Sequence, residues 1–333
     1  MNEGRRPTSL DVARLSGVSR ATVSYVLNRD PRQTISEATR RRVLDAAKEL
    51  GYAPSPAAAS LRRGHSRVVV LALDPLFSGH VSDIIVEGAT QRLREHGYYV
   101  VRHSHENPET VIDIVRGIGP IGVVSLTFLT ASIRERLTAL GVKRLLDLEV
   151  PTGAQGPPDR PWEYPVGQLQ LDHLITRGYR KLIYALPKDS PRLPIAMARL
   201  QGAQMEAVTL GIEPPEVIAL PLERAPIQRA LRKLERLERR TAICAYDDQI
   251  AIGVLGAMHD LGWRVREDLG VIGCDDLPVA RLVTPTLTTV RVTAVDVGFA
   301  AAESFLLLRD GETRTFDTPQ VDLGYEVVVR EST

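Results

Sequence analysis

The chain has only two cysteines, Cys244 and Cys274, among its 333 residues. Two cysteines exclude the disulfide framework of a secreted scaffold, and so few fit a reducing compartment. The sequence also lacks an apolar run of membrane length and a basic leader followed by an apolar segment. We therefore expect a cytoplasmic protein that does not bind a membrane.

Motifs of enzymes on α/β scaffolds are missing as well. No Gly-x-Gly-x-x-Gly follows the first apolar strand, and there is no phosphate-binding loop and no Gly-x-Ser-x-Gly elbow. We expect no catalytic residue, no cofactor and no metal. An enzyme on a doubly wound scaffold remains the alternative, and turnover of sugars or nucleosides would reveal it.

Charge is divided unevenly along the chain. Residues 1–67 carry 13 Lys and Arg against 6 Asp and Glu, whereas the remainder carries 29 against 35. A basic segment on an acidic body predicts a polyanion partner for that segment, with phosphate contacts dominating the affinity. A solvated basic surface is the alternative. A plain sugar-transport receptor would need a secretion signal where this chain has a basic head.

Residues 8–28 have the pattern of two short helices joined by a tight turn. Thr8 and Asp11 can form a capping box, and Gly17 supplies the positive φ of the turn. Leu10 and Ala13 are predicted to face inward, with Val12 as a further candidate. This unit is the one that places a recognition helix in the DNA major groove, although a helical hairpin with a solvated polar face has the same pattern.

The second helix begins after its cap, Ser19, and packs inward through Val23 and Val26. Its outward side chains are small or polar, as reading of base edges requires: Arg20, Ala21, Thr22, Ser24 and Tyr25. A third helix begins at Ser36 and is predicted to close a small core with Val43, Ala46, Ala47 and Leu50.

A proline-containing linker at residues 52–56 leads to a helix-capable stretch at residues 57–64. With this linker, the head resembles that of the lac-repressor (LacI/GalR) family of bacterial transcription factors. The residues that carry the resemblance are Asp11-Val12-Ala13, Gly17-Val18-Ser19, Thr22-Val23-Ser24, Asn28, Gly51-Tyr52-Ala53-Pro54 and Ser60-Leu61.

The resemblance implies a homodimer on double-stranded DNA, with a hinge helix that folds on a palindromic operator and a Leu61 wedge in the minor groove. It implies that Arg20 pairs with guanine. The implied DNA contacts are Ser19, Arg20, Ala21, Thr22, Ser24, Tyr25, Asn28, Ser60 and Leu61. The chain departs from many relatives at Ala59, where they carry an arginine.

From residue 67 onward, apolar strands alternate with amphipathic helices. Continuous apolar strands separated by helices predict parallel sheets covered on both faces, and their number predicts two doubly wound lobes. Ligands of such folds bind at the carboxyl ends of the strands. The predicted strands are residues 68–73, 98–102, 121–126, 144–148, 181–186, 241–245, 269–273 and 325–329.

This body resembles the family's effector domain, which is built like a periplasmic sugar-binding protein. The resemblance rests on residues 198–202, 247–253, 271–276 and 285–290. It implies a small-molecule effector, and a guanidinium flanked by two carboxylates suits the vicinal hydroxyls of a sugar. Helix caps or turn residues at strand ends are the alternative for the aspartates. The implied effector contacts are Phe77, Asp147, Tyr164, Arg199, Asp247 and Asp275.

The body departs from the family pattern at residues 157–167, where the usual Val-x-x-Asp-Asn-x-x-Gly-Gly segment is absent. A non-sugar effector, or no effector response, is therefore an alternative. Thiol sensing by Cys244 and Cys274 and a metal pair at His103 and His105 are further alternatives, but free cysteines are usually small buried hydrophobes, and no third metal ligand is apparent.

We predict an α + α/β protein: a three-helix helix-turn-helix head at residues 1–54, a hinge helix at 55–66, and a periplasmic-binding-protein-like body at 67–333. The N-lobe takes residues 67–163 and 295–323, and the C-lobe takes 164–294 and 324–333. The predicted function is that of an allosteric transcriptional regulator, a repressor, with its effector between the lobes. No leucine heptads follow the last strand, so we expect a dimer.

Overall fold

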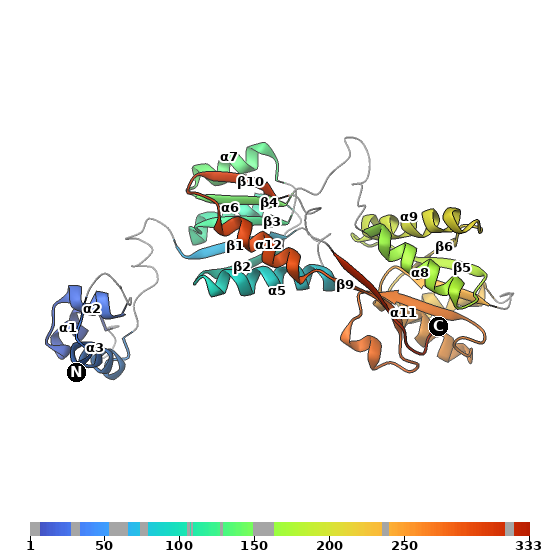
Figure 1. Cartoon of the computed structure of the whole chain (residues 1–333), viewed down its shortest axis with the longest axis horizontal. Coiled ribbons are helices and arrows are strands. Elements are labelled where there is room, and N and C mark those ends of the chain that lie inside the picture. The colour runs from blue at the N-terminus through green and yellow to red at the C-terminus, as the bar shows by residue number, and fades with distance from the viewer. Residues whose placement is uncertain are drawn as a thin grey trace. The chain divides into compact units, whose positions relative to one another are not determined.

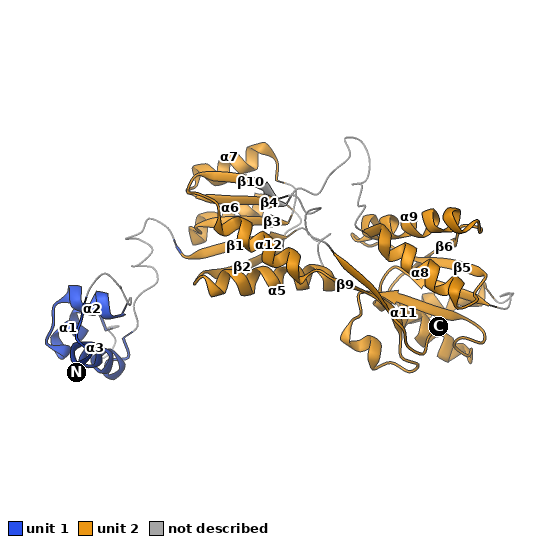
Figure 2. Cartoon of the chain, viewed as in Figure 1, with its two compact units in different colours: residues 1–66 blue, residues 67–333 orange. Residues whose placement is uncertain are grey.

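The computed structural model of the chain describes residues 7–27, 34–52, 66–73, 79–104, 107, 109–126, 129–148, 163–234, 240–316 and 323–333. The chain divides into two compact units, residues 1–66 and residues 67–333 (Figure 2). Each unit has a hydrophobic core of its own.

The first unit is a cluster of three helices: α1 (Ser9–Ser16), α2 (Arg20–Leu27) and α3 (Glu37–Glu49) (Figure 1). Small apolar side chains from all three fill its core: Val12, Ala13, Val23, Val26, Val43, Ala46 and Ala47. The expected helix-turn-helix head with a third closing helix is confirmed.

Local hydrogen bonds set the helix ends of this unit. The Thr8 N–H donates to Asp11 Oδ2 over 2.8 Å, and Ser36 Oγ accepts from the Thr39 N–H over 3.2 Å. The inward placement of Leu10 was wrong, since this side chain is 46% exposed. Val12, the further candidate, is buried with Ala13, because it shares one helix face with the buried Ser16 four residues on.

The body contains two sheets. The first has the order β10-β4-β3-β1-β2, and all its strand pairs are parallel. Its strands are β1 (Val68–Leu73), β2 (Tyr99–Ser104), β3 (Gly122–Leu126), β4 (Arg144–Leu148) and β10 (Glu312–Phe316). Its helices are α5 (His80–Glu95), α6 (Glu109–Ile118), α7 (Ala131–Ala139) and α12 (Val295–Leu306).

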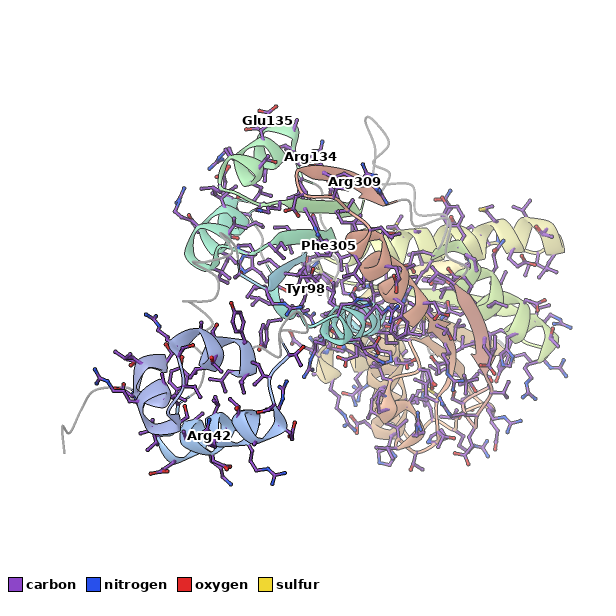
Figure 3. The ribbon with its side chains drawn as sticks, turned by 60° about the vertical axis from the view of Figure 1, so that its left-hand side comes forward. Arg42, Tyr98, Arg134, Glu135, Phe305 and Arg309 are labelled. Carbon is purple, nitrogen blue, oxygen red and sulfur yellow. The ribbon has the colours of Figure 1, made fainter. Side chains whose placement is uncertain are left out.

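Strand β1 explains why an unbroken apolar run is required here. Val69 and Leu71 pack in a core with side chains of α5 and α12, whereas Val70 packs in a second core with those of α6 and α7. Successive side chains of a strand point to opposite faces, so a sheet covered on both faces needs apolar residues throughout. Tyr98 and Phe305 meet edge to face in the first of these cores, with ring centroids 6.4 Å apart (Figure 3).

The second sheet has the order β11-β9-β8-β7-β5-β6. Its strands are β5 (Lys181–Pro187), β6 (Glu216–Leu220), β7 (Thr241–Ala245), β8 (Gly270–Cys274), β9 (Thr288–Thr293) and β11 (Gly324–Val328). Its helices are α8 (Tyr164–Thr176), α9 (Leu193–Leu210), α10 (Arg224–Arg232) and α11 (Asp248–Leu261), with a short helix η3 (Pro278–Arg281). Helices α8 and α9 cover one face of the sheet, and α11 lies on the other (Figure 1).

Two strands of this sheet carry the chain to and from the first sheet. Strand β9 leads into α12, and β11 follows β10. The pair β9–β11 is antiparallel, whereas the other pairs of the sheet are parallel. The prediction of two doubly wound sheets is therefore confirmed, with one antiparallel strand at an edge.

We expect Gly17→Ala to destabilise the head by about 1–2 kcal/mol, because Gly17 has φ +66° and an L-residue is strained there. An added Cβ would meet no atom within 4 Å, so the cost comes from the backbone alone. Gly17→Asn should lose less, since asparagine tolerates this conformation. Hydrogen exchange of the α1 and α2 amides in the full chain measures both losses. Equal losses for the two variants would contradict the backbone explanation.

Candidate functional site

The first turn of α2 presents the outward residues that the sequence predicts for DNA reading. Ser19, Arg20 and Ala21 are exposed, whereas Thr22, Ser24 and Tyr25 are half-buried. Ser19 Oγ accepts a hydrogen bond from the Thr22 N–H over 3.1 Å and so caps the helix. The cap leaves the small side chains of the first turn on the surface, where a groove could receive them.

The Arg20 guanidinium is held through its Nε and not through its two terminal nitrogens. Its Nε donates to Ser9 Oγ over 3.0 Å, and Arg20 is exposed while Ser9 is half-buried. A bidentate contact to guanine needs two N–H groups of the guanidinium. The bond to Ser9 uses only Nε, which leaves the terminal nitrogens to face solvent or a base edge.

Four residues of the predicted sites lie outside the described residues: Asn28, Ser60, Leu61 and Phe77.

In the body, the carboxyl ends of β7 and β8 carry the two aspartates that the sequence singled out. Asp247 follows β7 and caps α11, since its Oδ1 accepts from the Ile250 N–H over 2.9 Å. Asp275 follows β8, and both aspartates are buried. The helix-cap alternative therefore holds for one oxygen of Asp247, while its other oxygen faces an arginine.

Arg199 is 2% exposed and is held on three sides. Its Nε donates to Glu163 Oε2 over 2.7 Å, its Nη1 to the Tyr246 carbonyl over 2.6 Å and its Nη2 to Asp275 Oδ1 over 3.3 Å. The bond to Glu163, which caps α8, depends on the close approach of α8 and α9. Gly167 allows that approach, because a Cβ at this position would collide with the Arg199 carbonyl.

Arg192 lies beside the same aspartates but is held more loosely. Its Nη1 is 3.3 Å from Asp247 Oδ2, and its Nη2 is 3.7 Å from Asp275 Oδ2. Both distances exceed those of a strong charge-assisted hydrogen bond. The guanidinium stacks on the Tyr246 ring at 5.4 Å, and its buried Nε has no hydrogen-bond partner among the described residues.

A cavity of about 420 Å³ opens beside this cluster. Its polar lining comes from Lys188, Ser190, Arg192, Tyr246, Asp247 and Gln249, and its apolar lining includes Leu220, Leu222 and Ile250. Burial raises the pKa of Asp247, partly offset by its hydrogen bonds from Ile250 and Tyr246. The site offers donors and acceptors side by side, which is what a ligand hydroxyl needs, since it both donates and accepts.

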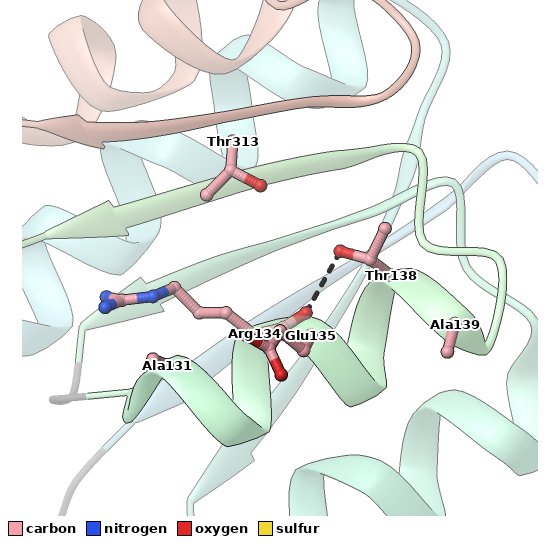
Figure 4. A pocket seen from close by; sticks show the side chains of 6 residues that line it. All are labelled: Ala131, Arg134, Glu135, Thr138, Ala139 and Thr313. Carbon is pink, nitrogen blue, oxygen red and sulfur yellow. Dashed lines mark hydrogen bonds between the residues drawn. The ribbon is translucent and has the colours of Figure 1, made fainter.

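The other two described effector candidates lie outside these contacts. Asp147 belongs to β4 of the first sheet, and Arg134 Nη1 lies 2.8 Å from its Oδ2. Arg134 also lines a separate cavity of about 550 Å³ on α7, with Thr313 of β10 opposite (Figure 4). Tyr164 begins α8, where its backbone lies against Gly202 of α9. None of the described contacts brings Asp147 to Arg199.

Sequence reasoning missed two members of the cluster. Glu163 lies in the segment that departs from the family pattern, so no motif marked it. Arg192 precedes α9 and has no periodic or motif signal. Only the fold reveals that both side chains converge with Arg199 on the ends of β7 and β8.

Several alternatives can be weighed against the described residues. Burial raises the pKa of both Cys244 and Cys274, which disfavours the thiolates that redox sensing needs. His103 lies 3.0 Å from Thr110 Oγ1, while His105 is outside the described residues. In the described part of the chain, no group of acidic, histidine or cysteine side chains could hold a metal. There too, no helix is long and apolar enough to cross a membrane.

Comparison with known proteins matches both units. Residues 8–55 fit the family model "Bacterial regulatory proteins, lacI family", and residues 171–333 fit that of a periplasmic binding protein-like domain. The chain thus combines a lacI-family helix-turn-helix region with a periplasmic-binding-protein-like domain. Relatives that match along most of the chain are HTH-type transcriptional repressors, so the enzyme alternative is not supported.

The family relatives match along most of the chain. It is 28% identical to the HTH-type transcriptional repressor PurR of Aliivibrio fischeri over 340 residues, 98% of each chain. It is 28% identical to the repressor CytR of Escherichia coli K12 over 322 residues, 91% of this chain and 89% of that one. The Lac repressor dimer bound to operator and the anti-inducer ONPF has the same fold, with a TM-score of 0.72, 22% identity and coverage of 98% and 99%.

Asp248, next to Asp247, has a purely structural environment. It is fully buried and accepts hydrogen bonds from Thr289 Oγ1 over 2.5 Å and from the Leu277 N–H over 2.7 Å. Burial nevertheless raises the pKa of this carboxyl to about 8. Asp248 thus joins α11 to β9 and to the chain after β8, at the cost of burying an acid.

We expect this burial to make stability fall as the pH rises from about 4 to about 8. The unfolded carboxyl has a pKa of about 3.9, so between these values the folded state binds more protons than the unfolded state. Asp248→Asn should flatten this dependence, and chemical unfolding of both proteins at pH 5 and pH 8 measures it. An unchanged pH dependence in the variant would contradict the assignment.

Proposed function

We propose that the protein is a sequence-specific repressor that binds a palindromic operator as a homodimer, with α2 in the major groove. The exposed first turn of α2 and the basic charge of residues 1–67 support this reading. A dimer doubles the recognition surface and matches its two-fold axis to that of the operator. A Lac repressor dimer with the same fold is bound to operator.

The proposed DNA contacts are those that the family pattern implies. Arg20 reads a base edge, and Ser19, Ala21, Thr22, Ser24, Tyr25 and Asn28 line the groove or its phosphates. Ser60 and Leu61 belong to the proposed hinge, residues 55–66, between a head at residues 1–54 and the effector domain at residues 67–333. The protein would work in the cytoplasm, where the DNA is.

We propose that a small polyhydroxylated molecule, a sugar or sugar derivative, binds between the two lobes and controls operator affinity. The observation that carries this proposal is the cluster of the half-buried Arg192 with the buried Arg199, Asp247 and Asp275, beside a cavity of about 420 Å³. Related structures include a transcriptional regulator CelR with cellobiose and a lacI-family regulator from Enterococcus faecium with ribose. Phe77, Asp147 and Tyr164 remain proposed effector contacts.

The two arginines have different parts in this proposal. The three bonds of Arg199 leave little donor capacity for a ligand, so Arg199 positions the carboxylates of Glu163 and Asp275. The long ion pairs of Arg192 can be exchanged for bonds to ligand hydroxyls, and its unpartnered Nε favours such an exchange. Arg192 thus becomes the arginine that contacts the effector, in place of Arg199.

An effector other than a sugar is the second candidate. Glu163 lies in the segment where relatives carry a different polar motif, and it is already engaged with Arg199. The site therefore keeps fewer unsatisfied acceptors than the family pattern implies. Because Arg192 offers only N–H donors, it would bind a ligand with more acceptors than donors, such as a nucleobase derivative.

We expect Arg20→Ala to relax the preference for one base pair of an operator selected from random DNA, by about 1–3 kcal/mol, because the bidentate contact is lost. Arg41→Ala, on the outer side of α3, serves as the control and should weaken all sequences alike or none. Binding to operator variants measures both effects. An Arg20→Ala protein with unchanged base preference would refute the base-reading role.

A thermal-shift screen of sugars and nucleosides against the full chain tests the effector site. We expect a member of the sugar set to raise the unfolding temperature, by mass action on the folded state. Arg192→Met should lose that shift, whereas Arg224→Met, at an exposed ion pair with Asp260, should keep it. A nucleoside hit would favour the second candidate. A sugar shift that survives in Arg192→Met would remove Arg192 from the site.

A further inference from the structure

Two consecutive aspartates, Asp275 and Asp276, both have positive φ, at +104° and +49°. Residues other than glycine rarely adopt such conformations, and they persist only where the surroundings over-determine them. Both side chains are buried. The contacts that hold this dipeptide therefore indicate what the strained backbone achieves.

Asp275 faces the arginines of the proposed effector site. Its carboxylate lies 3.3 Å from Arg199 Nη2 and 3.7 Å from Arg192 Nη2. Its own N–H donates to the Val290 carbonyl of β9 over 2.8 Å. One residue thus contacts the arginines with its side chain and β9 with its backbone.

Asp276 faces the opposite way, toward the strands that connect the two sheets. Its Oδ2 accepts from Arg291 Nε over 2.9 Å and from Nη2 over 2.7 Å, and its Oδ1 accepts from Arg330 Nη2. Arg291 of β9 also bonds Glu326 of β11 over 3.0 Å. Burial opposes the charged form of Asp276, but the two arginines outweigh it and hold the pKa of this carboxyl below its ordinary value.

The connectivity gives these bonds a consequence. Strand β9 leads directly into α12 of the first sheet, and β11 follows β10 on the way back. Side chains from both strands meet at Asp276, either directly or through Arg291. A shift of the backbone at Asp275 would therefore displace β9 and β11, the strands that connect the two sheets.

We propose that Asp276 is a positioning residue that transmits the state of the Asp275 carboxylate to β9 and β11. When Arg192 leaves Asp275, the strained dipeptide relaxes, and the Asp276 bonds to Arg291 and Arg330 loosen with it. The use of this coupling in effector control rests on the proposed function.

Hydrogen exchange of the full chain, without any ligand, tests this coupling. Arg192→Met should raise exchange of the β9 and β11 amides at least about threefold, although Arg192 contacts neither strand in the described structure. Amides of β6 and α10 report general destabilisation and should stay unchanged. Arg192→Lys should restore most of the protection, and Arg224→Met should change nothing in β9 or β11. Arg192→Gln replaces the Met variant if that protein does not fold.

The deciding arm is the double variant. In an Arg291→Met background, exchange in β9 and β11 is already raised, and Arg192→Met should add nothing. Exchange that is unchanged by Arg192→Met, or that rises equally in both backgrounds, overturns the proposal. These measurements use neither DNA nor an effector, so a failure of the proposed function would appear separately, as loss of the sugar shift or of operator preference.

Discussion

The body depends on one buried guanidinium, that of Arg199. A charge this deeply buried is tolerable only with close partners, and it has them in Glu163, the Tyr246 carbonyl and Asp275. These partners come from the start of α8, the end of β7 and the end of β8. The charge therefore fixes the register of α8 and α9 against the sheet, and Gly167 makes their approach possible. Removing one partner would leave the buried charge incompletely paired, and we expect this loss to destabilise the whole domain.

Arg192, the second arginine of the cluster, is held less tightly than Arg199. It shares Asp275 with Arg199 and takes Asp247 as well, but at distances that leave its hydrogen-bonding capacity unfilled. Arg199 thus holds Asp275 in place, and Arg192 is available for exchange. Asp275 lies between the fixed and the exchangeable partner, and its strained backbone also bonds β9. Asp275 thus connects the arginines of the proposed effector site to β9, one of the strands that link the sheets.

Much of the fold follows from patterns that act locally. Capping by Thr8 and Ser36, the turn glycine Gly17 and the apolar run of β1 each depend on neighbours in sequence or on burial on both faces, so the sequence predicts them. The inward placement of Leu10 was wrong because α1 has several apolar residues, and packing against α2 and α3 decides which of them is buried. Arg192, Glu163 and Asp276 could not be predicted as partners, since their roles arise from tertiary convergence alone. The motif residues Arg199, Asp247 and Asp275 were identified only through the family pattern.

Reciprocal linkage between operator and effector tests the central claim most directly. The measurement is the dissociation constant of the stabilising sugar, determined by calorimetry with the free protein and with the protein saturated by its selected operator. If the effector site and the head share one conformational equilibrium, the two constants differ, and by the same factor by which saturating sugar changes operator affinity. Identical constants, with and without operator, would contradict the account.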